Sequence, residues 1–257
     1  MSKDQENSRF DEELSDAIGQ RNEAWHAERL GRFTSSRFGD LMSTGTAGTT
    51  ARRKRIDKQL KEKEITKKAY DEELKDIENI EYNARFGEGC RTYVFEKMAE
   101  LMTNSVHMTG GSAATEWGTD QEEYAISEYE NRYGKTVKPC GFVKYGELAG
   151  GSPDGKIVGE KAIIEVKCPY NPANHIRTVI TNEIHKAYFW QVHGNILATD
   201  AEYCDFISYD PRMIDPSLRM HVIRVKRNIE TLDILRSRIQ EVADFMKIMM
   251  ENADLYD

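Results

Sequence analysis

The chain has 257 residues, of which 39% are hydrophobic and 31% charged, and its formal net charge is −8 at pH 7. This length suits one large domain or two small ones, with enough apolar residues for a buried core. No apolar run approaches the ~20 residues of a membrane helix, and the N-terminus lacks a signal peptide's apolar core. We therefore expect a cytoplasmic protein without a membrane partner. The negative charge argues against a uniformly nucleic-acid-attracting surface, but it allows a basic cleft on an acidic body.

Cysteine usage excludes two kinds of metal site. Successive cysteines are at least 28 residues apart, and no histidines occur at zinc-finger spacing. A structural zinc or an iron–sulfur cluster is therefore not expected.

The first half of the chain has helical patterning. Residues 52–78 are dense with charges of both signs, and their loose apolar stripe predicts a solvated helix or helical hairpin. We expect residues 43–110 to be a helical, charge-rich insertion within a single domain spanning 1–257. The basic start of the stripe, Arg52 to Arg55, could instead contact phosphates. Two further helices are predicted, over 83–103 and from Thr115 as N-cap to Gly134 as the stop.

The pattern changes to strands after residue 137. Residues 138–158 and 161–169 are strand-like and are joined by a turn at Gly159-Glu160. A helix is predicted over 182–199, followed by two strands at 201–210 and 218–228, and by a long amphipathic helix from Ile229. This order predicts a mixed α/β or α+β fold, with a central mixed sheet flanked by helices.

One stretch, "GGSPDGKIVGEKAIIEVKCPY" (150–170), places charges in an apolar strand. Residues two apart in a strand share a face, so Glu165 and Lys167 point to the same side. An unpaired charge buried there would cost several kcal/mol. The charges then form either a structural salt bridge or a site in which Asp154 and Glu165 bind a divalent metal and Lys167 faces the same pocket. Mg²⁺ takes oxygen ligands of this kind, and an ammonium nearby can stabilise phosphate charge.

These residues also carry a family resemblance. "SPDG" followed by "EVKCP" resembles the PD-(D/E)XK nuclease motif, and four more segments, in the same order, resemble the lambda exonuclease and YqaJ family of phage recombination exonucleases. They are "AWHAERLGRFTSS" (24–36), "EWGTDQEEYA" (116–125), "AYFWQVHGNILAT" (187–199) and "YDPRM" (209–213). Residues 43–110 align poorly with the family. The resemblance implies a PD-(D/E)XK restriction-endonuclease-like core.

The resemblance assigns roles to the matching residues. It implies metal binding by Asp154 and Glu165, with the Val166 carbonyl as a third ligand and Glu122 in a second metal site. Lys167 would be the catalytic lysine. Tyr188 and Gln191 would lie against the scissile region; without the family they are an ordinary aromatic and amide on a half-buried helix.

A second group of matching residues would hold a 5′-phosphate. Arg29, Ser36 and Ser152 occupy these positions, and an arginine fork suits phosphate recognition. Ser35 replaces a residue that is commonly alanine, which leaves open which serine faces the phosphate. Alternatively, Arg29 pairs with a local acid, Glu28 or Asp40, and residues 34–36 cap the following helix.

The implied activity is a Mg²⁺-dependent 5′→3′ exonuclease that degrades one strand of double-stranded DNA ends. Two Mg²⁺ per site are expected, with Mn²⁺ as a substitute. The 3′ overhangs would serve a phage single-strand annealing protein, and the family implies a homotrimeric ring in the bacterial host cytoplasm. The alternatives are a related PD-(D/E)XK endonuclease or RecB-like nuclease, and a non-catalytic DNA-end-binding protein.

Overall fold

The computed structural model describes residue 20, residues 22–106 and residues 112–252. The N-terminal segment that was expected not to be a signal peptide lies outside these residues, apart from Gln20. Residues 107–110 of the predicted 43–110 insertion also lie outside them.

The central feature is a five-stranded mixed sheet in the order β2-β5-β6-β7-β8. The strands are β2 (Val137–Lys138), β5 (Gly155–Ile157), β6 (Ala162–Lys167), β7 (Tyr203–Tyr209) and β8 (Met220–Lys226). Strand β6 lies at the centre, antiparallel to β5 and parallel to β7, with Glu165 opposite Phe206 and Lys167 opposite Ser208. The β5–β6 turn contains Gly159 at φ 77°, a conformation that favours glycine.

A smaller sheet stands beside the first. It has the order β1-β4-β3, with β1 (Phe33–Thr34) parallel to β4 (Ala149–Gly151) and β3 (Val143–Tyr145) antiparallel to it. Because β4 leads directly into the turn before β5, this small sheet places residues 33–36 close to the start of the Asp154 turn.

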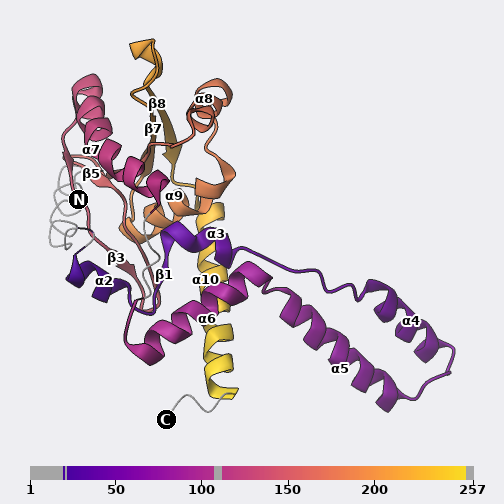
Figure 1. Cartoon of the computed structure of the whole chain (residues 1–257). Coiled ribbons are helices and arrows are strands. Elements are labelled where there is room, and N and C mark those ends of the chain that lie inside the picture. Colours follow the sequence, from indigo (N-terminus) through magenta and orange to yellow (C-terminus); the bar gives the residue numbers. More distant parts are fainter. Residues whose placement is uncertain (1–19, 21, 107–111, 253–257) are drawn as a thin grey trace, which may run out of the picture.

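Helices cover both faces of the five-stranded sheet (Figure 1). Helix α7 (Ala113–Tyr133) covers one face, where Ala125 and Tyr129 pack with Ile164 and Val166. The other face carries the larger core, which includes Ile163. Its helices are α3 (Phe38–Leu41), α6 (Glu88–Thr103), α9 (Lys186–Thr199) and α10 (Ile229–Asn252). The remaining helices on the body are α2 (Glu23–Arg29), η1 (Ser35–Arg37), α8 (Pro172–Thr181) and η2 (Pro216–Leu218).

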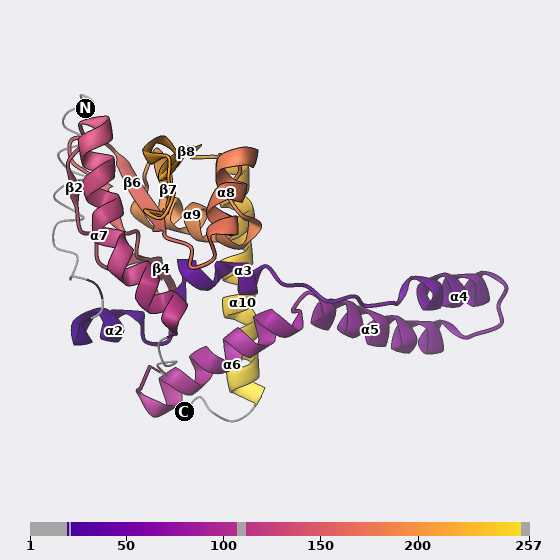
Figure 2. The same cartoon turned by 45° about the horizontal axis from the view of Figure 1, so that its top comes forward.

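Two helices leave the body as an arm, α4 (Thr50–Lys61) and α5 (Lys67–Ala84), which projects away in both views (Figures 1 and 2). A short apolar seam joins them through Ile56 and Ile77, and ion pairs flank it, including Arg52–Glu73 and Arg53–Glu81. The charge-rich part of the 43–110 segment is this arm, whereas α6 belongs to the main core. The four basic residues at the start of the arm include Arg52 and Arg53, which pair with acids of α5.

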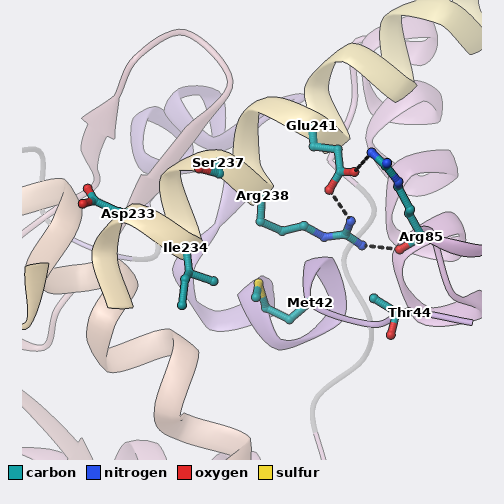
Figure 3. A pocket seen from close by; sticks show the side chains of 8 residues that line it. All are labelled: Met42, Thr44, Arg85, Asp233, Ile234, Ser237, Arg238 and Glu241. Atoms are coloured by element: carbon teal, nitrogen blue, oxygen red, sulfur yellow. Dashed lines mark hydrogen bonds and ion pairs between the residues drawn. The ribbon is translucent and has the colours of Figure 1, made fainter. Parts of the chain in front are cut away.

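The arm is fastened to the body at its root by Arg238 of α10 (Figure 3). Its guanidinium donates hydrogen bonds to the carbonyls of Leu41, Ser43 and Arg85, and also to Glu241. These carbonyls belong to the two chain segments that lead into and out of the arm. A cavity of about 820 Å³ opens beside this contact.

The predicted fold class is confirmed, but three helix boundaries were wrong. The helix predicted over 83–103 begins at Glu88, because residues 83 and 84 are the end of α5. Helix α7 is capped by Ser112, whose side chain accepts the Thr115 N–H, so Thr115 is inside the helix; the predicted stop at Gly134 is correct. The helix predicted from residue 182 begins at Lys186, because Asn182 ends a separate helix, α8, in a left-handed conformation. Within the described residues, no helix is both long enough and apolar enough to span a membrane.

Candidate active site

Strand β6 and the turn before β5 bring three charged side chains together. The Nζ of Lys167 lies 2.5 Å from Oε1 of Glu165, so both side chains lie on one face of the strand as expected. Asp154 lies in the turn before β5, where its Oδ2 accepts a 2.6 Å hydrogen bond from the Val166 N–H. This bond fixes the turn against β6 beside the Glu165–Lys167 pair.

Two amides of helix α9 hold the carboxylate of Glu165, which is fully buried. Gln191 Nε2 donates to Oε1 at 2.5 Å, and Asn195 Nδ2 donates to Oε2 at 2.7 Å. With Lys167, these contacts give both oxygens polar partners and fix the orientation of the group. The ion pair predicted as one alternative is therefore present, within a larger polar network.

A cavity of about 570 Å³ lies where β6 ends. Its wall includes Glu122 of α7, Asp154 of the turn, Val166 and Lys167 of β6, and Tyr188 of α9. The volume is within the range of small-ligand sites. The structure thus brings Glu122 to the same cavity as Asp154 and Lys167. Glu165 is buried and contacts Lys167 of the cavity wall.

The electrostatics of the site follow from burial and charge crowding. Burial, and next the nearby charge of Glu165, raise the pKa of Asp154 well above its usual range. Burial also raises the pKa of Glu165, against the opposing effect of Lys167. For Lys167, burial alone would lower the pKa, but Glu165 and Asp154 outweigh it and raise the pKa. Negative charge on the two carboxyl groups is therefore disfavoured, a cation beside them would stabilise it, and the lysine stays protonated.

The donor set fits a hard cation such as Mg²⁺. Among the described residues no three His, Cys, Asp or Glu side chains form a complete metal cluster. However, Mg²⁺ is usually held by one or two carboxylates, with waters and substrate phosphates as the other ligands. Asp154 and Glu122 line the cavity with oxygen donors, and Glu165 lies within the same electrostatic group.

Arg29 is held at the end of α2 by an aromatic ring. Its guanidinium lies 3.9 Å from the ring centroid of Trp25, and Trp25 Nε1 also donates a 3.0 Å hydrogen bond to Ser152 Oγ. Trp25 thus joins two of the residues predicted to hold a 5′-phosphate, although sequence reasoning gave it no role. Its spacing of four from Arg29 on one helix was the available signal.

In the described part of the chain, Arg29 makes no ion pair with Glu28 or Asp40, the two acids named in the alternative. Glu28 pairs with Lys144, and Asp40 pairs with Arg37. Burial lowers the pKa of Arg29, opposed by the more weakly acting Tyr93 and Glu100. A half-buried guanidinium on an aromatic ring suits an anionic ligand.

The two neighbouring serines face different ways. Ser36 is exposed, with its Oγ 3.3 Å from Thr34 Oγ1. Ser35 is buried, and its Oγ donates a 2.6 Å hydrogen bond to Asn195 Oδ1. No capping hydrogen bond is made by the side chain of Thr34, so the capping alternative is not supported there. Of the two serines, Ser36 is the one open to solvent.

Asn195 is the main polar residue of the site that sequence reasoning missed. It accepts from Ser35 and donates to Glu165, so a continuous chain of hydrogen bonds links the N-terminal segment to the centre of β6. A Cβ at Gly151 would lie 2.5 Å from Asn195 Oδ1, so glycine there leaves room for this contact. Asn195 follows Gln191 by four residues and so shares its helical face, but its partner Ser35 is 160 residues away.

Comparisons with known proteins agree with this architecture. A family described as "YqaJ-like viral recombinase domain" matches residues 24–202. The fold is similar to the crystal structure of an alkaline exonuclease (LHK-Exo) from Laribacter hongkongensis, with a TM-score of 0.68 and 22% identity over 91% of this chain and 96% of that chain. The complex of LHK-Exo with dAMP has a TM-score of 0.66 and 23% identity, over 91% and 98%.

A phage-related exonuclease from Haemophilus somnus 129PT has a TM-score of 0.58 and 15% identity, over 86% of this chain and 96% of that chain. No curated protein matches the chain. The family match covers well over half of the sequence and includes the Asp154 turn, strand β6 and helix α9. The chain belongs to the family of YqaJ-like viral recombinase domains.

Proposed function

We propose that the protein is a Mg²⁺-dependent exonuclease that degrades one strand of double-stranded DNA from its 5′ end. The observation that carries the proposal is the convergence of Glu122, Asp154 and Lys167 on one cavity beside the buried carboxylate of Glu165. Family membership supports a role in recombination. The similarity in fold to LHK-Exo, an alkaline exonuclease whose complex with dAMP is known, supports a nuclease with a nucleotide-sized site.

Each residue of the cavity has a chemical task in this proposal. Asp154, Glu165, Glu122 and the Val166 carbonyl would hold the metal. When bound, Mg²⁺, two ions per site with Mn²⁺ as a substitute, would polarise the scissile phosphate and lower the pKa of a water. Lys167, protonated because of its carboxylate neighbours, would stabilise the negative charge that develops on the phosphate.

Two residues of α9 would position these groups. Gln191 holds Glu165, and the ring of Tyr188 lies 5.2 Å from Lys167 Nζ. Both therefore restrict the charged groups at the reacting centre, which is how orientation contributes to rate. We also propose that Tyr188 limits access of water to Lys167, because it forms part of the cavity wall.

Polarity would come from the 5′-phosphate. Arg29, aligned by Trp25, would make the charged contact, while Ser36 and Ser152 would donate hydrogen bonds. Ser152 is two residues from Asp154, so a phosphate bound there would be close to the catalytic centre. The hydroxyl of Ser35 already donates to Asn195, so Ser35 would instead orient Asn195 and, through it, Glu165.

We propose a homotrimeric ring that encircles DNA and works with a single-strand annealing protein, which would receive the 3′ overhang. A ring supports DNA binding by an acidic chain, because basic residues need to line only the channel. The net charge of −8 would then lie mainly on the outer surface. Sedimentation velocity tests the assembly: a trimer mass is expected, and a monomer at all concentrations would contradict it.

The polarity proposal is tested with linear duplexes that carry either a phosphate or a hydroxyl at the 5′ end, in Mg²⁺ or EDTA. We expect Mg²⁺-dependent release of mononucleotides from the 5′ end and faster degradation of phosphorylated ends. Arg29→Gln should abolish the preference for phosphate while retaining slow hydrolysis. Equal rates for both ends in the native protein would contradict the phosphate pocket, and cutting of circular DNA would favour an endonuclease.

A further inference from the structure

An exposed tyrosine stands at the rim of the active-site cavity. Tyr170 is 55% exposed and lines the cavity together with Lys167 and Tyr188. It follows Lys167 by three residues and therefore lies no more than about 10 Å from it along the chain. The Tyr170 side chain is therefore accessible both to solvent and to a ligand in the cavity.

The backbone at Tyr170 is fixed by hydrogen bonds from the loop between β7 and β8. Arg212 donates to the Tyr170 carbonyl at 3.1 Å and to the Pro169 carbonyl at 3.0 Å. Arg212 is itself fixed by two 2.8 Å hydrogen bonds to the fully buried Asp210. The "YDPRM" segment thus anchors the residues that follow the catalytic lysine.

A second aromatic ring supports the first. Trp117 of α7 meets the ring of Tyr170 edge to face, with 6.5 Å between centroids, and Arg212 lies 4.4 Å from the centroid of Trp117. Trp117 therefore contacts the Tyr170 ring and Arg212 fixes its backbone, yet more than half of the residue is exposed. Such a preorganised aromatic loses little entropy when a flat ligand stacks on it.

We propose that Tyr170 is a stacking platform for a nucleobase of the DNA strand being degraded. The inference rests on the proposed function and deepens it by identifying how the base, as well as the phosphate, is held. While a phosphate lies by Lys167, the base of an adjacent nucleotide reaches the rim. Aromatic stacking accepts every base because each has a π-face. This property suits an enzyme that removes nucleotides regardless of sequence.

The test compares Tyr170→Ala, Tyr170→Phe and a matched control, Tyr124→Ala. Tyr124 is 65% exposed on α7 and does not line the cavity. Because Tyr170 is exposed, its truncation leaves the core intact. Affinity is measured in Ca²⁺ instead of Mg²⁺, with a duplex that carries 2-aminopurine at or next to its 5′ terminus, and kcat and KM are measured in Mg²⁺.

The expected result is a weaker affinity for Tyr170→Ala by about 5- to 150-fold, with a rise in KM larger than any fall in kcat. The quenching of 2-aminopurine on binding should disappear in Tyr170→Ala and persist in Tyr170→Phe and Tyr124→Ala. If Tyr170→Ala binds and quenches as the native protein does while DNA is still degraded, the stacking platform is wrong and the nuclease stands. If the native protein neither binds nor degrades DNA, the proposed function fails and the platform fails with it.

Discussion

Glu165 shows how much a single residue of the site depends on its neighbours. It is fully buried, and its two oxygens accept from Lys167, Gln191 and Asn195. Asn195 is in turn oriented by Ser35, in the segment that we propose binds the DNA end. Asn195, which does not line the cavity, thereby sets the direction of a carboxylate that we propose holds the metal.

We predict that Asn195→Ala lowers kcat by about 10- to 100-fold with little change in KM, because Glu165 loses its fixed orientation. The buried hydroxyl of Ser35 and one oxygen of Glu165 lose a partner, so the free energy of unfolding should fall by about 2 kcal/mol. Steady-state kinetics and urea denaturation measure the two effects. Gln240→Ala, which removes an exposed amide from α10, is the control and should leave both unchanged. An unaltered kcat in Asn195→Ala would show that the hydrogen-bond chain is only structural.

At the scale of elements, the arm of α4 and α5 depends on its root. Arg238 is 7% exposed and donates to three backbone carbonyls where the two segments of the arm meet α10 (Figure 3). Arg238 is the charged donor to all three carbonyls. Backbone hydrogen bonds from Gly45 to Ala84 and from Gly87 to Ser43 join the same two segments, and Arg238 adds the buried charged contact that ties them to α10.

We predict that Arg238→Ala reduces the free energy of unfolding by about 3 kcal/mol, because the carbonyls of Leu41 and Arg85 lose a charged donor and that of Ser43 keeps only the Gly87 N–H. Hydrogen exchange should rise in residues 41–45 and 85–87 more than in the central sheet. Arg236→Ala is the matched control on the same helix. Arg236 makes an exposed ion pair with Asp233, whose loss should change stability by less than about 1 kcal/mol. Equal effects of the two variants would contradict the role given to Arg238.

The free energy of unfolding should depend on pH through Asp210, in the loop between β7 and β8. Burial alone would raise the pKa of Asp210, but hydrogen bonds from Arg212 lower it. Because the pKa is lowered on folding, the ionised carboxylate stabilises the fold above the unfolded-state value of about 3.9, and this contribution is lost as the pH falls through the folded-state value. We predict that Asp210→Asn costs about 1 kcal/mol above about pH 5, a modest figure because Arg212 is partly exposed.

As the pH falls below the unfolded-state value of about 3.9, the difference between Asp210→Asn and the native protein should shrink. Urea denaturation at several pH values measures it. A difference that stays constant or grows on acidification would contradict the lowered pKa.

Local sequence patterns predicted helices and strands better than they predicted which distant residues contact one another. The stop at Gly134 and the face shared by Glu165 and Lys167 follow from geometry within a few residues. The contact of Ser35 with Asn195 joins residues 160 apart, and although both lie in segments that carry the family resemblance, no spacing in the sequence pairs them. Helix α8 was not predicted, although Asn171 and Pro172 are a typical helix start.

At the scale of the whole molecule, the site lies where the layers of the fold meet. Helix α7 brings Glu122 across one face of the sheet, α9 brings Tyr188 and Gln191 to the other, and β6 ends between them (Figure 2). The family resemblance rather than residue spacing indicated Glu122, since nothing in the sequence shows which helix covers the end of β6. The proposed chemistry needs all three elements at once.

The most direct test of the central claim is the degradation of phosphorylated linear duplex DNA in Mg²⁺ by the native protein, Lys167→Ala and Asp154→Asn. We predict that the native protein degrades the linear duplex from its 5′ ends and leaves a circular plasmid intact. Each variant should lose activity by about 100-fold or more, because a charge that stabilises the reacting phosphate or holds the metal is gone. Degradation at the native rate by either variant would contradict the assignment of this cavity as the active site.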